Sequence, residues 1–103
     1  MKLQGEPKLS VRVLSPTRTY FDGKALSVSA SNKVGRFDIL ADHANFFSML
    51  TEGDIVVDMG HDSEFRLAVT QGIIKVTNNT VTFFIDIGPS YSSVSQPKVT
   101  PTD

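Results

Sequence analysis

The chain has 103 residues, of which 40% are hydrophobic, so it can bury one modest core and has no length for a second domain. Its 10 basic and 11 acidic residues give a formal charge of -1, so nucleic acid, which selects for a cationic excess, is not expected as a partner. The chain has no cysteine, no apolar leader and no apolar run near the roughly 20 residues that cross a bilayer, so we expect a soluble protein of a reducing compartment, without direct membrane insertion.

Apolar residues recur with a period of two along most of the chain, which is the pattern of half-buried β-strands. In chain order, strands are expected in LSVRVLS (9–15), ALSVSA (25–30), DIVVDM (54–59), EFRLAVTQ (64–71), GIIKVT (72–77) and TVTFFIDI (80–87). In the last of these, Val81, Phe83 and Ile85 are predicted to form one face. No window shows a capped helical stripe.

Turn residues separate these strands at short intervals. They are Asp22-Gly23, Asn32 to Gly35, Glu52-Gly53, Gly60 to Asp62 and Asn78-Asn79. Many short strands between such turns predict an all-β fold, an antiparallel sandwich or barrel over residues 9–87, after an N-terminal extension at 1–8. From residue 88 the chain is rich in Ser, Pro and Thr, so a disordered tail is expected at 88–103.

The stretch GRFDILADHANFFSML places Asp42 and His43 in an otherwise apolar segment, and such a pair suits a proton relay, a metal site or a polar turn. Ser48 is the nearest downstream hydroxyl, but in an extended segment it lies on the order of 15 Å from His43, too far for a triad. The other histidine, His61, falls in a predicted turn without paired ligand spacing. We favour a turn in which Asp42 and His43 bond to backbone, with no catalytic residue and no metal. No phosphate-binding glycine motif is present, so no cofactor is expected.

Phe46 and Phe47 are adjacent, so on a strand their rings point to opposite faces. One ring enters the core, and alternation does not say which. The other is either a partner-facing aromatic or a lone exposed apolar side chain.

Several spacings recur together between about Leu9 and Ile87. SPTRTYFDG precedes ALSVSA, and then follow Gly35-x-Phe37-x-Ile39, His43-Ala44, Phe46-Phe47-Ser48, Leu50, Gly53, GIIKV and NTVTFFID. This ordered set resembles the N-terminal β-sandwich domain of the epsilon subunit of F-type ATP synthases, whose mitochondrial equivalent is called delta.

The resemblance implies two packed five-stranded sheets, about ten strands in all, and a non-catalytic subunit of the central stalk, or rotor. Such a subunit docks the gamma subunit to the membrane c-ring and helps to couple ion flow to ATP synthesis. It is peripheral to the cytoplasmic face of a bacterial membrane or to the equivalent face in an organelle. The ring-facing loops would contain Gly35 and Arg36, and Ala41, Asp42, His43, Ala44 and Asn45, with Phe46 or Phe47 facing a partner.

The sequence also departs from the usual pattern of that family. Where members usually have Gly, Pro, Gly and Pro around the histidine, this chain has Asp38, Ala41, Asp42 and Asn45, so the turn is expected to rely on Asx-type hydrogen bonds. Arg36 stands where an acidic residue is usual. The helical hairpin that many members carry after the sandwich, which can restrain ATP hydrolysis, is expected to be absent, so we expect neither ATP binding nor that restraint.

Two alternative functions remain open at this point. A stand-alone ligand-binding or protein-binding β-sandwich needs a concave polar pocket or a suitable surface. A small hydrolase needs a base and a nucleophile in contact.

Overall fold

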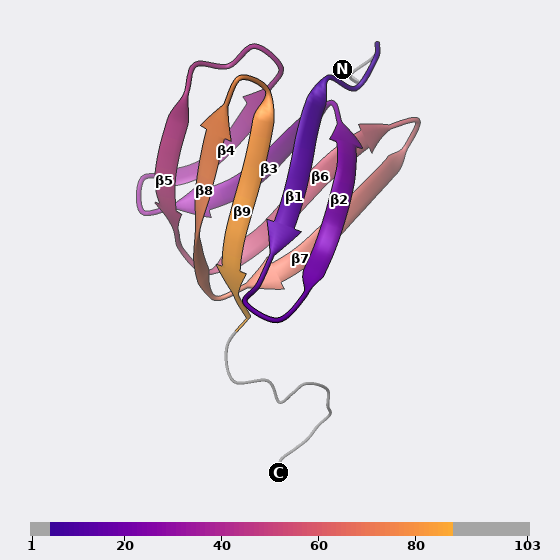
Figure 1. Cartoon of the computed structure of the whole chain (residues 1–103). Helices are drawn as coiled ribbons and strands as arrows, with labels where there is room; N and C mark the ends of the chain where they lie inside the picture. Colours follow the sequence, from indigo (N-terminus) through magenta and orange to yellow (C-terminus); the bar gives the residue numbers. More distant parts are fainter. Residues whose placement is uncertain (1–4, 88–103) are drawn as a thin grey trace.

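Two sheets of short strands pack face to face (Figure 1). Their apolar sides meet in the core between them. This computed structural model describes residues 5–87. The strands are β1 (Leu9–Leu14), β2 (Thr19–Ala25), β3 (Ser27–Asn32), β4 (Gly35–Leu40), β5 (Phe46–Leu50), β6 (Gly53–Gly60), β7 (Ser63–Val69), β8 (Gln71–Thr77) and β9 (Thr80–Asp86).

Five strands form sheet A, in the order β2-β1-β9-β8-β5, and four form sheet B, in the order β4-β3-β6-β7. β1 and β9 are parallel, and every other neighbouring pair is antiparallel. The predicted all-β, two-sheet sandwich is therefore confirmed. Within residues 5–87 the sheets have five and four strands in place of the expected five and five. β5 follows β4 in the chain but pairs with β8 of sheet A.

Residues 1–4 and 88–103 lie outside the described part of the chain. The predicted disordered tail and the predicted absence of a helical hairpin fall there and stay predictions. Residues 5–87 contain no helix long and apolar enough to cross a membrane.

The core lies between the sheets and takes alternate residues from the strands of both. Val81, Phe83 and Ile85 are buried, which confirms the predicted inner face of β9. The other buried apolar residues are Leu9, Val11, Val13, Ala25, Val28, Ala30, Ile39, Leu50, Ile55, Val57, Val69, Ile74 and Val76. At Gly72 the strands β8 and β9 approach so closely that an added Cβ would lie 2.5 Å from the carbonyl oxygen of Phe84.

Two local predictions are wrong. Asp22-Gly23 is not a turn but lies inside β2, where the two residues pair with Arg12 and Val11. The chain reverses instead at residues 15–18, where the Ser15 hydroxyl accepts hydrogen bonds from the amides of the third and fourth residues of that turn. The Ser-Pro dipeptide at residues 15–16 carried that turn signal.

The predicted strand ALSVSA is also divided between two strands. Ala25 ends β2 in sheet A, Leu26 forms a bend, and Ser27 begins β3 in sheet B. The chain therefore passes from one sheet to the other in the middle of an alternating pattern.

Candidate docking surfaces

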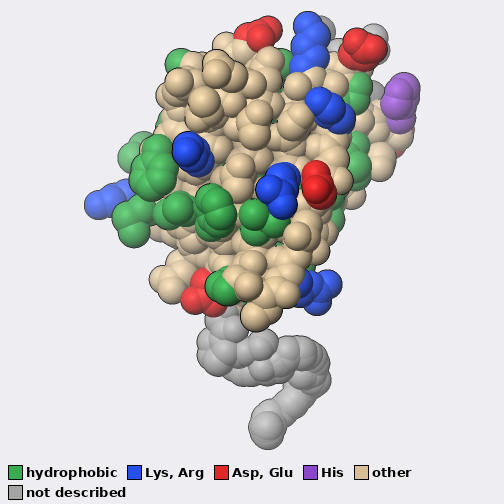
Figure 2. Space-filling model, viewed as in Figure 1, with side chains coloured by type: hydrophobic (Ala, Val, Ile, Leu, Met, Phe, Trp, Pro, Cys, Tyr) green, Lys and Arg blue, Asp and Glu red, His purple; other side chains and the backbone are tan. Residues whose placement is uncertain are grey.

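An apolar band crosses the outer face of sheet A. Met49, Ile73, Phe84 and Leu14 lie opposite one another on β5, β8, β9 and β1, and Phe47 lies two residues from Met49 on the same face of β5. Phe47, Met49 and Phe84 are 64%, 74% and 47% exposed. With strands about 4.8 Å apart, the row of four spans about 14 Å. Figure 2 shows the band in green across this face of the molecule.

Cationic side chains border the apolar band on one side. The next row across sheet A begins with Phe47 on β5 and continues with Lys75 on β8, Thr82 on β9, Arg12 on β1 and Asp22 on β2. Arg12 Nε lies 3.8 Å from a carboxylate oxygen of Asp22, with both side chains exposed, so this pair is weak and screened by salt. The face therefore offers an apolar line with a basic edge.

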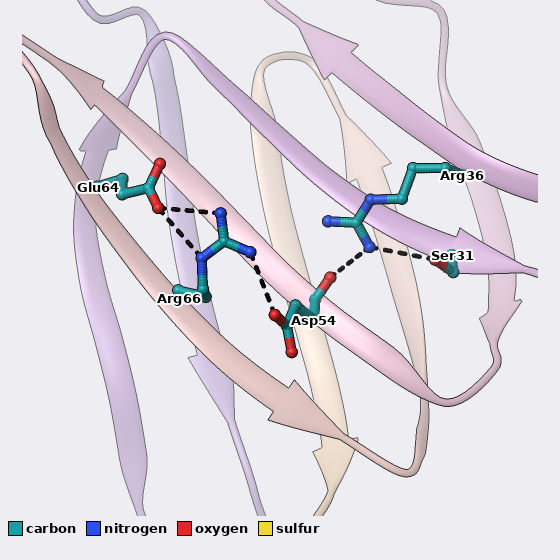
Figure 3. Close-up of polar contacts among 5 residues, drawn as sticks. All are labelled: Ser31, Arg36, Asp54, Glu64 and Arg66. Atoms are coloured by element: carbon teal, nitrogen blue, oxygen red, sulfur yellow. Dashed lines mark hydrogen bonds and ion pairs between the residues drawn. The ribbon is translucent and has the colours of Figure 1, made fainter.

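The outer face of sheet B has the opposite chemistry. Small hydroxyl side chains, Ser27, Ser29 and Ser31, run along β3. Arg66 Nη1 lies 3.1 Å from Asp54 Oδ2, and Arg66 Nη2 lies 3.1 Å from Glu64 Oε2 (Figure 3).

Hydrogen bonds from Arg66 to Asp54 and then to Glu64 raise the pKa of the Arg66 guanidinium above its ordinary value. Because that group is already protonated at neutral pH, it stays charged throughout the usual range. The outer face of sheet B is thus permanently polar.

Gly35 and Arg36 were expected in a loop but are the first two residues of β4, directly after the turn from β3, and the Arg36 side chain lies along sheet B. Its Nη1 donates to Ser31 Oγ at 3.1 Å and to the carbonyl oxygen of Asp54 at 2.5 Å (Figure 3). The turn before it is closed by Asn32, whose Oδ1 accepts from the amides of Val34 and Gly35. This is an Asx-type turn, but the sequence predicted such hydrogen bonds for the turn around His43, at the other end of β4.

Residues 41–45, hereafter the docking loop, connect β4 to β5 and carry the predicted residues Ala41, Asp42, His43, Ala44 and Asn45. Asp42 has a φ of 66° and does not bond to its own turn. Its backbone amide donates to Asn79 Oδ1 at 2.6 Å, and Asn79 Nδ2 donates back to Asp42 Oδ1 at 3.2 Å. The expectation that Asp42 caps its own turn is therefore wrong, because its partner lies in the turn between β8 and β9.

His43 does bond to nearby backbone, as predicted. Its Nδ1 lies 2.7 Å from the Ala44 carbonyl oxygen, which can only accept, so Nδ1 carries the proton. The imidazole meets the Phe46 ring edge-on, with centroids 5.8 Å apart, and Phe46 in turn contacts Phe37 at 5.4 Å. These ring contacts hold the docking loop against Phe46 on β5, which in turn packs against Phe37 on β4.

The same contacts settle the orientation of the two adjacent phenylalanines. Phe46 is partly buried and packs against the core, whereas Phe47 points outward into the apolar band. Phe47 therefore lies beside another exposed apolar side chain, Met49, and is not a lone exposed apolar residue.

The two predicted loops lie at opposite ends of β4, which separates them by about 17 Å in an extended strand. Both border β5. The docking loop leads into Phe46, and the turn between β3 and β4 lies beside the second half of β5, where Asn32 Nδ2 donates to Ser48 Oγ at 3.1 Å. A single partner must therefore extend along the β5 edge to reach both.

The geometry of a catalytic triad is not found in this segment. The Ser48 hydroxyl accepts from Asn32 and donates to the carbonyl oxygen of Met49, and the His43 ring bonds to Ala44. Within residues 5–87 no group of three or more His, Asp or Glu side chains is arranged to hold a metal ion.

Sequence reasoning missed the four-residue row of the apolar band and Asn79. The row had a signal in adjacent apolar pairs, because each pair supplies one inward and one outward residue. The pairs are Val13-Leu14, Met49-Leu50, Ile73-Ile74 and Phe83-Phe84. Asn79 was recognised only as a turn residue, since its contact with Asp42 spans 37 positions.

Comparison with known proteins gives a family match over the whole sandwich. The family model for the β-sandwich domain of the ATP synthase delta/epsilon chain matches residues 8–87. The chain is 37% identical over 79 residues to the ATP synthase epsilon chain of Synechococcus elongatus, covering 76% of this chain and 56% of that one. It is 28% identical over 92 residues to the ATP synthase epsilon chain of Endomicrobium trichonymphae, covering 89% and 66%. The chain thus spans between 56% and 66% of the length of these relatives.

Solved structures show the same fold. A chain in the cryo-EM structure of the Euglena gracilis mitochondrial ATP synthase (OSCP, F1 and c-ring) aligns with a TM-score of 0.71 at 12% identity, covering 82% of this chain and 57% of that one. A chain in the cryo-EM structure of the central stalk and c-ring of the Tetrahymena thermophila enzyme aligns with a TM-score of 0.64 at 18% identity, covering 81% and 66%.

Proposed function

This chain belongs to the family of ATP synthase delta/epsilon β-sandwich domains, and we propose that it is a non-catalytic subunit of the central stalk of an F-type ATP synthase. In this function it docks the gamma subunit to the membrane c-ring, so that the rotor turns as a unit and ion flow is coupled to ATP synthesis. It would be peripheral to the cytoplasmic face of the membrane, or to the equivalent face in an organelle.

The observation that carries this proposal is the apolar band on sheet A. Soluble domains rarely leave aligned apolar side chains in water unless a partner covers them. The row from Met49 to Leu14, with Lys75 and Arg12 along one side, suits a partner segment that has an apolar stripe and carboxylates beside it. We assign this face to the gamma subunit.

The loops along the β5 edge are assigned to the c-ring. The docking loop offers exposed polar groups of Asp42, His43 and Asn45, which suit the polar loops of a ring better than an apolar surface. Gly35 and Arg36 would contact the ring only if the ring surface extends along β5 from the docking loop to the turn between β3 and β4. Because the Arg36 guanidinium is already bonded to Ser31 and Asp54, its charge would act at the rim of this contact.

The test compares two substitutions at equally exposed apolar residues on opposite faces. Phe84 in the band is 47% exposed, and Leu40 on the outer face of sheet B is 44% exposed. Threonine suits a strand at either site. When the tagged chain is co-expressed with gamma and c-ring, we expect the wild type and Leu40→Thr to retain both partners and Phe84→Thr to lose gamma.

Thermal melting of each isolated variant separates lost docking from lost folding. Recovery of the wild-type chain alone, from a complex that is otherwise assembled, would overturn the stalk function. If Phe84→Thr and Leu40→Thr lose gamma equally, gamma does not bind specifically to the apolar band.

A further inference from the structure

The Asn79 side chain fastens the docking loop to the rest of the sandwich. Its Oδ1 accepts the Asp42 amide at 2.6 Å, while its Nδ2 donates to the Asp42 carboxylate at 3.2 Å. The backbone carbonyl of Asn79 also accepts the Ser10 amide, at 2.8 Å, at the start of β1. One residue therefore ties three segments together: the docking loop, the turn between β8 and β9, and β1.

A second, longer contact runs beside this pair. The Asn78 amide lies 3.4 Å from Asn45 Oδ1, near the other end of the docking loop. His43 lies between the two attachment points, and its amide donates to the Leu40 carbonyl at 3.3 Å. The position of His43 is thus set by bonds on both sides of it.

Few residue types can take the place of Asn79. The site needs one donor, one acceptor and a left-handed backbone, with φ at 63°. Asparagine supplies all three, because its amide carries both hydrogen-bonding groups and its short polar side chain tolerates the left-handed region. Aspartate lacks the donor, and glycine keeps the backbone but lacks both groups.

We propose that Asn79 is a positioning residue, which holds the docking loop in the conformation that contacts the c-ring. This inference rests on the proposed function. Asn79 itself lies outside the predicted loops and acts through Asp42. The shape presented to the ring is then fixed before docking, so the ordering of the loop does not have to be completed at the moment of association.

Three variants of the full chain test this assignment. Asn79→Gly keeps the turn and removes both side-chain bonds. Asn79→Asp keeps the acceptor for the Asp42 amide but places two carboxylates together. The double variant Asp42→Asn with Asn79→Asp exchanges the two side chains and restores one donor facing one acceptor. His61→Gly, at a left-handed residue of the turn between β6 and β7, is the matched control.

Two quantities are measured for each variant: the hydrogen-exchange rate of the residue 42 amide by NMR, and the affinity of the chain for purified c-ring with bound gamma. Both single variants at position 79 should speed exchange and weaken binding about tenfold, the effect of losing about one to two hydrogen bonds. The exchanged pair should restore both quantities, and His61→Gly should change neither.

Unchanged exchange in Asn79→Gly would show that the contact does not hold the loop in solution, which overturns the inference. Faster exchange with wild-type ring affinity, or an exchanged pair that recovers slow exchange but not affinity, would overturn it as well. If the wild-type chain itself fails to bind the ring, both the proposed function and the positioning function of Asn79 are wrong. The exchange rates would still show whether Asn79 holds the docking loop.

Discussion

The outer faces of the two sheets have the same strand geometry but opposite chemistry. On sheet A, outward apolar residues of four neighbouring strands fall into one row. On sheet B, Leu40 and Val56 also point outward, but Leu40 lies opposite Ser27 and Val56 lies opposite Ser29, so they occupy different rows.

The two faces therefore differ in the alignment of apolar residues across strands more than in their number, and the proposed docking of gamma depends on that alignment. An isolated outward apolar side chain such as Leu40 is ordinary on a protein surface. A row of them offers a partner continuous area to cover, whereas polar side chains on the outer face of sheet B bond to one another, as Ser29 does to Asp38 and Arg66 to Asp54.

The largest effect is expected where the apolar band depends on a close approach of backbones. In Gly72→Ala the new Cβ would lie 2.5 Å from the Phe84 carbonyl oxygen, a contact with backbone that no side-chain rotation relieves. We expect a loss of about 3 kcal/mol in the free energy of unfolding, which lowers the melting temperature by about 15 °C. Binding of gamma should weaken too, because the alanine pushes β9, and with it Phe84, out of line.

Gly23→Ala is the matched control in the same sheet. An added Cβ there meets the ring of Phe21 at 3.3 Å, and a side chain can give way where a carbonyl cannot. A melting temperature of Gly72→Ala equal to that of Gly23→Ala would show that β8 and β9 leave room for a methyl group at residue 72.

The second prediction concerns the two phenylalanines of β5. Phe46→Ala removes a partly buried ring that contacts Phe37 and His43, so we expect a loss of about 2 kcal/mol, less than for a fully buried ring. Phe47→Ala should change stability by about 0.5 kcal/mol or less and weaken docking instead. Chemical denaturation measures the first quantity and co-purification with gamma the second. The reverse order of stabilities would contradict the inward orientation of Phe46.

Period-two alternation predicted the fold because burial on one side of a strand selects apolar residues at every second position. Val81, Phe83 and Ile85 are buried as expected. The turn signal failed at Asp22-Gly23, where a dipeptide typical of turns is accommodated inside β2 by pairing with β1. Alternation itself missed the sheet change at Leu26, because it does not record which sheet a strand joins.

The candidate surfaces were predictable only in part, because some of their residues are neighbours in the sequence and others are far apart in it. The residues of the docking loop are contiguous, so their exposure and turn conformation could be expected from local sequence. The apolar band needs the register of four strands, since adjacent apolar pairs such as Ile39-Leu40 also occur on sheet B, where they form no row. The contact between Asp42 and Asn79 joins residues 37 positions apart, which no local pattern encodes.

The smallest effect is expected on the polar face, at Arg66. Its bonds to Asp54 and Glu64 raise its pKa, so any stability that it contributes is fully present below its ordinary pKa and is lost only as pH rises through the raised value. Between about pH 6 and about pH 9, titration of Arg66 should therefore leave the difference in melting temperature between wild type and Arg66→Gln unchanged. That difference should be at most about 2 °C, because the Arg66 side chain is more than half exposed to water, and it should shrink further in about 1 M salt. A difference larger than that of Phe46→Ala, or one that persists in salt, would mean that the polar face stabilises the fold through its ion pairs, and the contrast between the two faces would no longer be one of docking against solvation.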